Sequence, residues 1–336
     1  MHRIKSLVVF GFLFSACTHS KEHRTSVSFY YWKTVFHLTD AEKLLLQENN
    51  VDRLYVRYMD IALQKGEALP LSPVVFEDTL LPAAIVPVVY VRNEVMLQPS
   101  LDVAALATQT VNYIHQINHA AGITSQEIQI DCDWTLTSRE NYFIFIEAVK
   151  KQWRKTLSAT IRLHQIKYYQ RTGIPAVDRG VLMYYNMGRI AADSSNSIYD
   201  REIAQKYTQH LKGYPLPLDV ALPVFSWGIH VRNNTVIGLL NKIDDTTFSE
   251  DEHFVRKADP FFEVKENVIK IGHYFKQGDR IKIESVDIND LQEMTNDLSD
   301  EMPRPPQEII FYDLDHFNLK HYEKEKQFFQ KISRAF

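Results

Sequence analysis

The sequence has few cysteines and none of the common short motifs for metal, redox or nucleotide chemistry. Its 336 residues include two cysteines, Cys17 and Cys132, so no disulfide framework is expected. No HExxH, CxxC, P-loop or GxSxG pattern occurs, which leaves metalloprotease, redox, nucleotide-binding and serine-hydrolase functions unsupported. The acidic stretch 244–252 lacks EF-hand spacing. We therefore expect no cofactor and no metal.

An excess of positive charge is also missing. The formal net charge is −4, and a mildly acidic chain argues against nucleic acid as a partner. Aromatic residues, by contrast, are plentiful, with 17 Tyr, 19 Phe and 4 Trp. Many of these rings belong in a core, but a chain rich in Tyr and Trp also suits stacking on carbohydrate.

The first 16 residues have the features of a secretory signal peptide. Arg3 and Lys5 give a positive start, residues 7–14 are apolar, and Ser15 and Ala16 are small. The segment is too short to span a membrane as a helix. A cysteine directly after the small residues resembles the lipobox of bacterial lipoproteins. That resemblance implies cleavage before Cys17, a lipid on Cys17, and a chain anchored in the bacterial cell envelope, on its periplasmic or outer-surface side. The alternative is an ordinary cleaved signal with a cysteine there by chance.

Residues 17–26 are polar and are interpreted as a short tether, and residues 27–336 as one folded unit. The strands that we predict lie at 27–32, 52–58, 84–91, 127–134, 156–162, 180–186, 218–225 and 308–313. The helices that we predict lie at 39–46, 101–120, 138–154, 200–212 and from about 318. Eight strands with helices between them predict a closed (β/α)8 TIM barrel. An open doubly wound sheet is the alternative, but no glycine-rich loop follows the first strand.

Residues 231–300 interrupt this alternation. They contain a charged stretch and short strand-like runs. We predict that they form an insertion between strands seven and eight, which could act as a small lid.

The strand at 127–134 carries the most specific chemical signal. Side chains alternate along a strand, so Gln129, Asp131 and Asp133 share one face, and the apolar residues between them share the other. Two close carboxylates repel each other, and one of them then tends to keep its proton near neutral pH. Such a group can act as a general acid, so Asp131 and Asp133 are the candidate catalytic residues.

Polar and aromatic side chains also end several other predicted strands. In (β/α)8 enzymes the active site is built at the C-terminal ends of the strands. The residues that we predict to bind a substrate there are Tyr30, Trp32, Arg57, Arg92, Arg162, Tyr185, Asn186, Trp227 and Asp313.

The acidic strand resembles the D-x-x-D-x-D-x-E strand of the family 18 glycoside hydrolases, which are chitinase-like barrels. Residues 183–186, Met-Tyr-Tyr-Asn, resemble the M-x-Y-D/N strand of the same family. The chain after the tether is also similar to a bacterial lipoprotein family with glycosidase-like barrels and a Q-I-D-x-D strand. These resemblances imply a TIM barrel that acts on or binds a glycan.

Two alignments of the acidic strand with that pattern are possible. If Asp131 and Asp133 take the two aspartate positions, Thr135 falls on the catalytic glutamate. If the register slides by two residues, Gln129 and Asp131 take those positions and Asp133 becomes the acid. The S-x-G-G pattern of the family's third strand is missing, and no tryptophan ends strand eight.

The mechanistic hypothesis assigns proton donation to Asp133. Asp131 would raise the pKa of Asp133 and stabilise charge, and Asp313 or Asp315 could supply a second carboxylate. Tyr185 and Asn186 would orient the sugar, and Trp32 or Trp227 would offer a stacking face. The structural alternative is a buried ion network in which Asp131 pairs with an arginine: Arg57, Arg92 or Arg162.

The predicted function is that of a glycoside-hydrolase-like envelope protein that hydrolyses or processes a glycan. Two alternatives stay open: a non-catalytic carbohydrate-binding barrel, and an envelope scaffold that binds a protein. The sequence gives no prediction of the oligomeric state.

Overall fold

Eight parallel strands form a closed barrel in the computed structural model, which describes residues 25–322 and 325–336. The barrel strands are β1 (Ser26–Tyr31), β3 (Arg53–Gln64), β6 (Ala84–Val91), β7 (Glu127–Asp131), β8 (Thr156–Arg162), β9 (Arg179–Met183), β10 (Leu218–Pro223) and β18 (Glu308–Tyr312). β1 pairs with both β3 and β18, which closes the barrel. The predicted (β/α)8 barrel is confirmed, and each predicted strand overlaps one of these eight.

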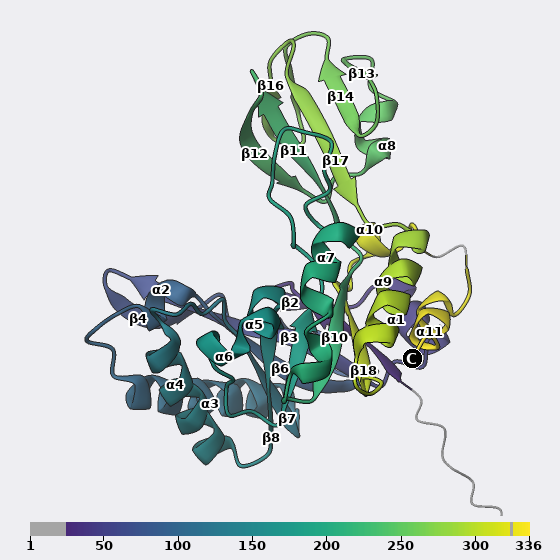
Figure 1. Ribbon diagram of the computed structural model, residues 1–336. Coiled ribbons are helices and arrows are strands. Elements are labelled where there is room, and N and C mark those ends of the chain that lie inside the picture. Colours follow the sequence, from purple (N-terminus) through teal and green to yellow (C-terminus); the bar gives the residue numbers. More distant parts are fainter. Residues whose placement is uncertain (1–24, 323–324) are drawn as a thin grey trace, which may run out of the picture.

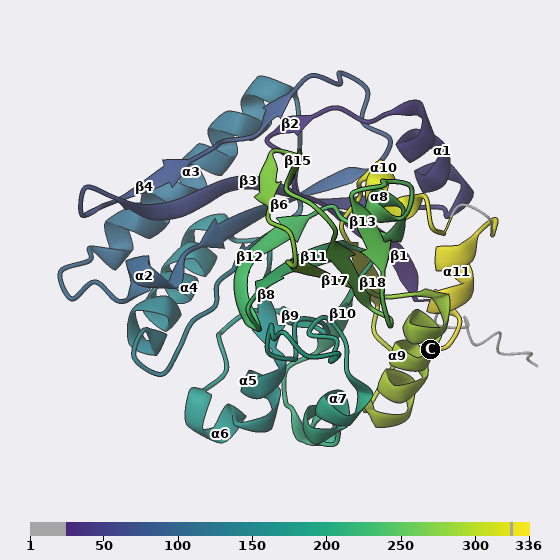
Figure 2. The same ribbon diagram turned by 90° about the horizontal axis from the view of Figure 1, so that it is seen from above.

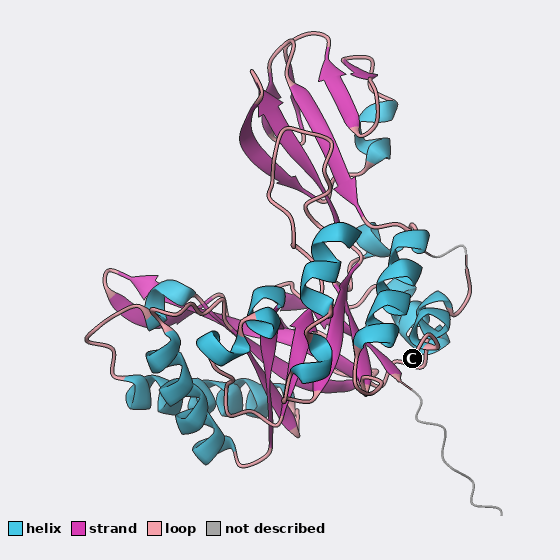
Figure 3. Ribbon diagram, in the orientation of Figure 1, coloured by secondary structure: helices cyan, strands magenta, loops and turns pink. Residues whose placement is uncertain are grey.

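Helices surround the barrel (Figures 2 and 3). They are α1 (Asp40–Glu48), α2 (Asn93–Met96), α3 (Val103–Ala121), α4 (Arg139–Trp153), α5 (Leu163–Lys167), α6 (Tyr169–Thr172), α7 (Arg201–Thr208), α9 (Ile288–Glu301), α10 (His316–Leu319) and α11 (Phe328–Ser333). A capping box of Thr39 and Glu42 starts α1. Gly122 ends α3 in the left-handed region, at φ 65°.

The C-terminal segment differs from the single helix that we predicted from residue 318. The chain forms two short helices there, α10 and α11. Between them Tyr322 is buried, stacks on Phe328 at a centroid distance of 5.2 Å, and donates its hydroxyl to the Val286 carbonyl. These contacts with the rest of the barrel hold Tyr322 in a turn, an outcome that the local sequence pattern does not encode.

Smaller elements extend the barrel. β4 (Glu67–Leu71) pairs antiparallel with the long β3, β2 (Val35–Phe36) pairs with β5 (Val75–Phe76), and a 3-10 turn covers Leu211–Gly213.

A second sheet stands between β10 and β18 in the chain and rises from the C-terminal end of the barrel (Figure 1). Its strands, in sheet order, are β12 (Thr235–Asn241), β11 (Ser226–Arg232), β17 (Arg280–Ser285), β14 (Phe261–Val264) and β13 (Phe254–Arg256). The same segment contains helix α8 (Asp245–Ser249) and a separate two-stranded sheet of β15 (Val268–Lys270) and β16 (His273–Phe275). The sheet has its own buried apolar cluster, which includes Phe248, Phe262 and Ile281. We call residues 226–285 the insertion; α9, which follows it, packs against barrel helices α7 and α11.

The N-terminal half of the barrel interior holds charge. Arg179 lies at its centre and forms ion pairs with Glu127, Asp219 and Glu308. The Tyr55 hydroxyl donates to Glu308 at 2.6 Å. All three carboxylates are buried, so Arg179 balances charge that water does not reach. This charged layer was not predicted from the sequence.

Cys132 lies on the outward face of its strand segment and is buried with the apolar core. Burial, followed by the charges of Asp131 and Asp133, raises the pKa of this thiol well above its usual range. We expect Cys132 to resist a soluble thiol reagent in the folded protein and to react fully in denaturant. A spectrophotometric thiol assay with and without urea checks this, and rapid labelling of Cys132 in the native protein would contradict it.

Within the described ranges, no helix has the length and apolar character needed to cross a membrane. The predicted signal segment 1–16 and the predicted lipid site Cys17 lie outside the described residues.

Candidate functional site

Asp131 ends β7 inside the barrel and is 6% exposed. The Thr160 hydroxyl, from neighbouring β8, donates to Asp131 Oδ1 at 2.7 Å. Burial raises the pKa of Asp131 to about 6; the charge of Arg162 and the Thr160 hydrogen bond oppose this rise, and Asp133 and Asp60 add to it. Asp131 is therefore a carboxyl group that changes charge slightly below neutral pH.

Asp133 lies just beyond the end of β7 and is paired with Arg162 from β8. Arg162 donates to Asp133 Oδ1 through Nε, and its Nη2 is within ion-pair distance of the same oxygen. Burial alone would lower the pKa of Arg162, but Asp133 and Asp131 raise it. Arg162 thus stays charged, and it ties the outer carboxylate to the adjacent strand.

The described residues do not form the ion network around Asp131 that was the structural alternative. No basic side chain lies within ion-pair distance of Asp131 in the described part of the chain, although the charge of Arg162 acts on it. Arg57 pairs with Asp60 at 2.7 Å, and Arg92 is exposed at the start of α2. The buried network occurs at the other end of the barrel, around Arg179.

Aromatic rings form a continuous row across the mouth of the barrel. Centroid distances are 5.4 Å from Trp32 to Tyr312, 5.7 Å from Tyr312 to Tyr185, 5.8 Å from Tyr185 to Phe225, and 5.3 Å from Phe225 to Trp227. Trp227 belongs to β11, so the row runs from the barrel onto the insertion.

The row is held in place by hydrogen bonds and packing at its ends. Trp227 Nε1 donates to Glu284 Oε2 at 2.8 Å. Tyr30 packs on Trp32 at a centroid distance of 5.9 Å and donates its hydroxyl to Gln129 at 2.7 Å. Burial raises the pKa of Tyr185 well above its usual range, and the neighbouring Tyr312 adds to this, so both phenols stay neutral.

Sequence reasoning missed two members of the row, Tyr312 and Phe225. Glu308, Ile310 and Tyr312 alternate along β18, so their side chains point to the same, inward side of the strand. This alternation of side chains could have placed Tyr312 in the mouth. Phe225 lies at the end of the predicted strand 218–225, and nothing in the local sequence indicates that its ring is only partly buried and joins the row.

Asn186 and Asp313 lie at the margin of this group. Asn186 is exposed and has a left-handed backbone, at φ 53°. Asp313 accepts a hydrogen bond from Asn318 at 2.6 Å. Burial, and then the nearby Asp315, raise the pKa of Asp313 to about 6. Asp315 itself pairs with Lys33 and with Lys242 of the insertion.

Thr135 occupies the exposed loop after Asp133. Its backbone N–H donates to Ser138 Oγ at 2.8 Å, and that hydroxyl is 2.5 Å from Asn93 Oδ1. A pocket of about 380 Å³ lies beside it, lined by Trp134, Thr135, Leu136, Thr137, His164, Tyr168, Arg171 and Thr172. Across residues 25–322 and 325–336, no group of three or more His, Cys, Asp or Glu side chains could hold a metal ion.

The raised pKa of Asp131 predicts a pH dependence of stability. Between the ordinary aspartate pKa of about 3.9 and the folded value of about 6, the folded chain binds more protons at this group than the unfolded chain. This group's contribution to the free energy of unfolding therefore falls as pH rises from about 4 to about 6. An Asp131→Asn variant should lack that fall and gain about 2–3 kcal/mol relative to the parent across this range. Urea denaturation at several pH values measures it.

The control for this comparison is Asp52→Asn, which changes an exposed carboxyl group. Its unfolding free energy should follow that of the parent protein at every pH. If the unfolding free energies of Asp131→Asn and the parent ran parallel against pH, the pKa of Asp131 would not be raised in the folded protein.

Solved structures with the same fold include a spore cortex-lytic enzyme and two chitinases. The spore cortex-lytic enzyme SleL of Bacillus cereus superposes with a TM-score of 0.56 at 13% identity, covering 93% of this chain and 74% of that one. A chitinase from Chromobacterium violaceum gives 0.54 at 11% identity, covering 93% and 98%. A family 18 chitinase variant from Cycas revoluta, in complex with (GlcNAc)4, gives 0.50 at 10% identity, covering 93% and 99%.

At these identities the likeness establishes the fold, a (β/α)8 TIM barrel, and no more. No protein-family model and no curated protein sequence matches the chain.

Proposed function

We propose that this protein binds a glycan across the mouth of its barrel and does not cleave it. The observation that carries the proposal is the row of rings from Trp32 to Trp227, which ends on the insertion. Four of the five rings are partly exposed, Tyr185 is buried among them, and the charge of Arg162 reaches Tyr185 and Tyr312. Chitinase-like barrels of the same fold, one of them in complex with (GlcNAc)4, support a glycan as the ligand class.

The arrangement suits a sugar chemically. Ring faces pack on the flat, apolar faces of pyranose rings. A carboxylate and a guanidinium held side by side offer acceptors and donors to neighbouring sugar hydroxyls. Their fixed geometry reduces the ordering cost of binding.

Hydrolysis needs a proton donor at the scissile bond, and the chain is poorly equipped with one. In the first register, the donor position is Thr135, whose hydroxyl does not give up a proton near neutral pH. In the second register the donor is Asp133, but Oδ1 of its carboxyl group already accepts a hydrogen bond from Arg162, so this oxygen is engaged by the protein and not by a substrate.

One observation favours cleavage as a second candidate function. Asp131 has a pKa of about 6 and no basic partner at ion-pair distance among the described residues, so it carries a proton for part of the time near neutral pH. In that case Asp131 and Asp133 would be the catalytic pair, and Tyr185 would orient the sugar.

The proposal includes secretion and a lipid anchor at Cys17, which rest on the sequence pattern of residues 1–17. β1 starts at Ser26, at the same end of the barrel as Glu308, its partner in the sheet. A fully extended tether from Cys17 to Ser26 spans about 30 Å. An anchor there would hold the N-terminal end of the barrel towards a membrane and leave the mouth facing away from it.

A glycan array probed with the full-length protein tests the proposal, with Asp133→Asn run in parallel. The parent should bind a defined set of glycans, and Asp133→Asn should bind them at least several-fold more weakly because it loses the charged pair with Arg162. No binding to any glycan would overturn the proposal. It would favour the protein-binding scaffold instead, with exposed Ile237, Ile269 and Tyr274 of the insertion as its contact surface.

A further inference from the structure

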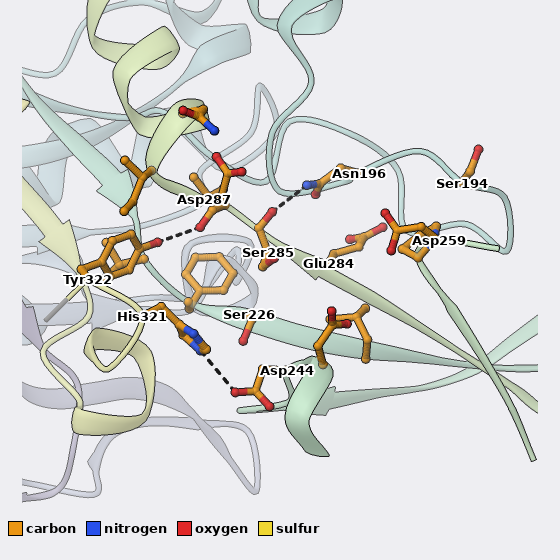
Figure 4. Close-up of a pocket in the computed structure, with 18 of the residues that line it drawn as sticks. Ser194, Asn196, Ser226, Asp244, Asp259, Glu284, Ser285, Asp287, His321 and Tyr322 are labelled. Atoms are coloured by element: carbon orange, nitrogen blue, oxygen red, sulfur yellow. Dashed lines mark hydrogen bonds and ion pairs between the residues drawn. The ribbon is translucent and has the colours of Figure 1, made fainter. Parts of the chain in front are cut away.

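A pocket of about 750 Å³ lies where the insertion joins the barrel (Figure 4). Asp131, Asp133 and Arg162 do not line it. Its walls come from residues 194–196, 224–226, 244–245, 259–260, 283–289 and 321–322. A volume of this size holds a small organic ligand.

One wall carries hydroxyl groups that have no partner. Ser226 is 7% exposed, and its hydroxyl has no hydrogen-bond partner among the residues that the structure describes. Figure 4 shows its side chain at the pocket, between Ser285 and Asp244. Ser226 and Ser285 are opposite each other in the β11–β17 pair, so their side chains leave the sheet on the same face. The Ser226 oxygen is not among the atoms that the fold seals from solvent, so it is open to the cavity and can exchange hydrogen bonds with a ligand there.

Three of the five carboxylates that line the pocket are matched by close basic side chains. The pairs are Asp244–Lys320 at 2.6 Å, Asp245–Arg256 at 2.7 Å and Glu284–Lys282 at 2.7 Å. Asp259 lies 3.5 Å from the same Arg256. Asp287 has no basic partner among the described residues, but it accepts the Asp290 N–H at the N-terminus of α9, where the helix dipole is positive. The carboxylate oxygens can still accept hydrogen bonds from neutral donors.

The remaining wall is apolar and aromatic. Phe225 contributes its ring, which also packs on Trp227, and Tyr322 and Ile283 lie on other sides of the cavity. Hydroxyls, charge-matched carboxylates and a ring together suit an uncharged ligand that is rich in hydroxyl groups and has one apolar face.

We propose that this junction pocket binds an uncharged mono- or disaccharide, as a second site that is separate from the barrel mouth. The proposal rests on the pocket alone and does not need the mouth to bind glycan. With both sites occupied, the protein would hold two points of a polymer, or two sugars, on either side of Phe225.

Calorimetric titration of the full-length protein tests this with glucose, xylose, N-acetylglucosamine and their β-1,4-linked disaccharides. The titrations use the Arg162→Ala variant, in which the mouth is impaired. We expect at least one sugar to bind this variant. Adding Ser226→Ala should weaken that binding about fivefold, since one hydrogen bond is lost. Adding Asn289→Trp, an exposed residue at the rim of the pocket, should weaken it more than tenfold by filling the cavity.

Tyr214→Phe is the matched control, because it removes another buried hydroxyl without a described partner, outside the pocket. Its affinity should equal that of Arg162→Ala alone. Absence of binding of every sugar to Arg162→Ala, or binding that survives Asn289→Trp, would overturn the junction site. If the parent protein binds a sugar whose binding is lost in Asn289→Trp but unchanged in Arg162→Ala, that result would support the junction site and contradict binding at the barrel mouth.

Discussion

Replacing Arg162 with alanine is expected to reduce glycan affinity by roughly 10- to 100-fold, the range for losing charged hydrogen bonds. Arg162 contacts Asp133 directly and its charge acts on Asp131. Its removal would free Asp133 from its fixed position and raise the pKa of Asp131 further. Titration calorimetry with a glycan found on the array measures the loss.

The matched control is Arg92→Ala. Arg92 follows another barrel strand, β6, but is exposed, so its removal should leave affinity unchanged. Because the Asp133 side chain is 45% exposed, water can replace Arg162, and the Arg162→Ala protein should lose no more than about 1 kcal/mol of stability. Binding by Arg162→Ala equal to that of the parent would place the glycan elsewhere.

The largest effect on stability is expected from Arg179→Met. This change leaves Glu127, Asp219 and Glu308 buried without their central cation, and uncompensated buried charge costs about 3–5 kcal/mol. The loss should be smaller at pH 5 than at pH 7.5, because protonation removes the repulsion. Burial already raises the pKa of Asp219 to about 6, against the opposing charge of Arg179. Urea denaturation at both pH values checks the result.

Arg53→Met provides the comparison for Arg179→Met. Arg53 reaches Glu127 and Glu308 at 3.5 and 3.4 Å, but its side chain is 39% exposed. Solvent screens such a pair, so its loss should cost about 1 kcal/mol or less. Equal stabilities of the Arg179→Met and parent proteins would show that the charged layer does not support the barrel.

The alternation of strands and helices was enough to predict the barrel, because buried strands and amphipathic helices are recorded locally in the sequence. The same period-2 argument put Gln129 and Asp131 on one face of their strand, and in the structure they accept hydrogen bonds there from Tyr30 and Thr160. Helix α9 was not predicted, because residues 231–300 were assigned as a whole to the insertion.

Contacts between distant segments could not be predicted in this way. Glu127 and Glu308 begin strands that are 181 positions apart in the chain, and only closure of the barrel brings both to Arg179. The pairing of Asp133 with Arg162 likewise depends on the register of β7 against β8. The sequence supplied the two carboxylates as a candidate pair; the fold gave one of them an arginine partner and buried the other.

The most direct test of binding without cleavage is whether a bound glycan stays intact. The full-length protein would be incubated in excess over an oligosaccharide that it binds, and the sugar recovered and weighed by mass spectrometry. A binding barrel with Thr135 at the proton-donor position should return the oligosaccharide at its original mass. Shorter products that disappear in the Asp131→Asn variant would contradict this account and establish a glycoside hydrolase.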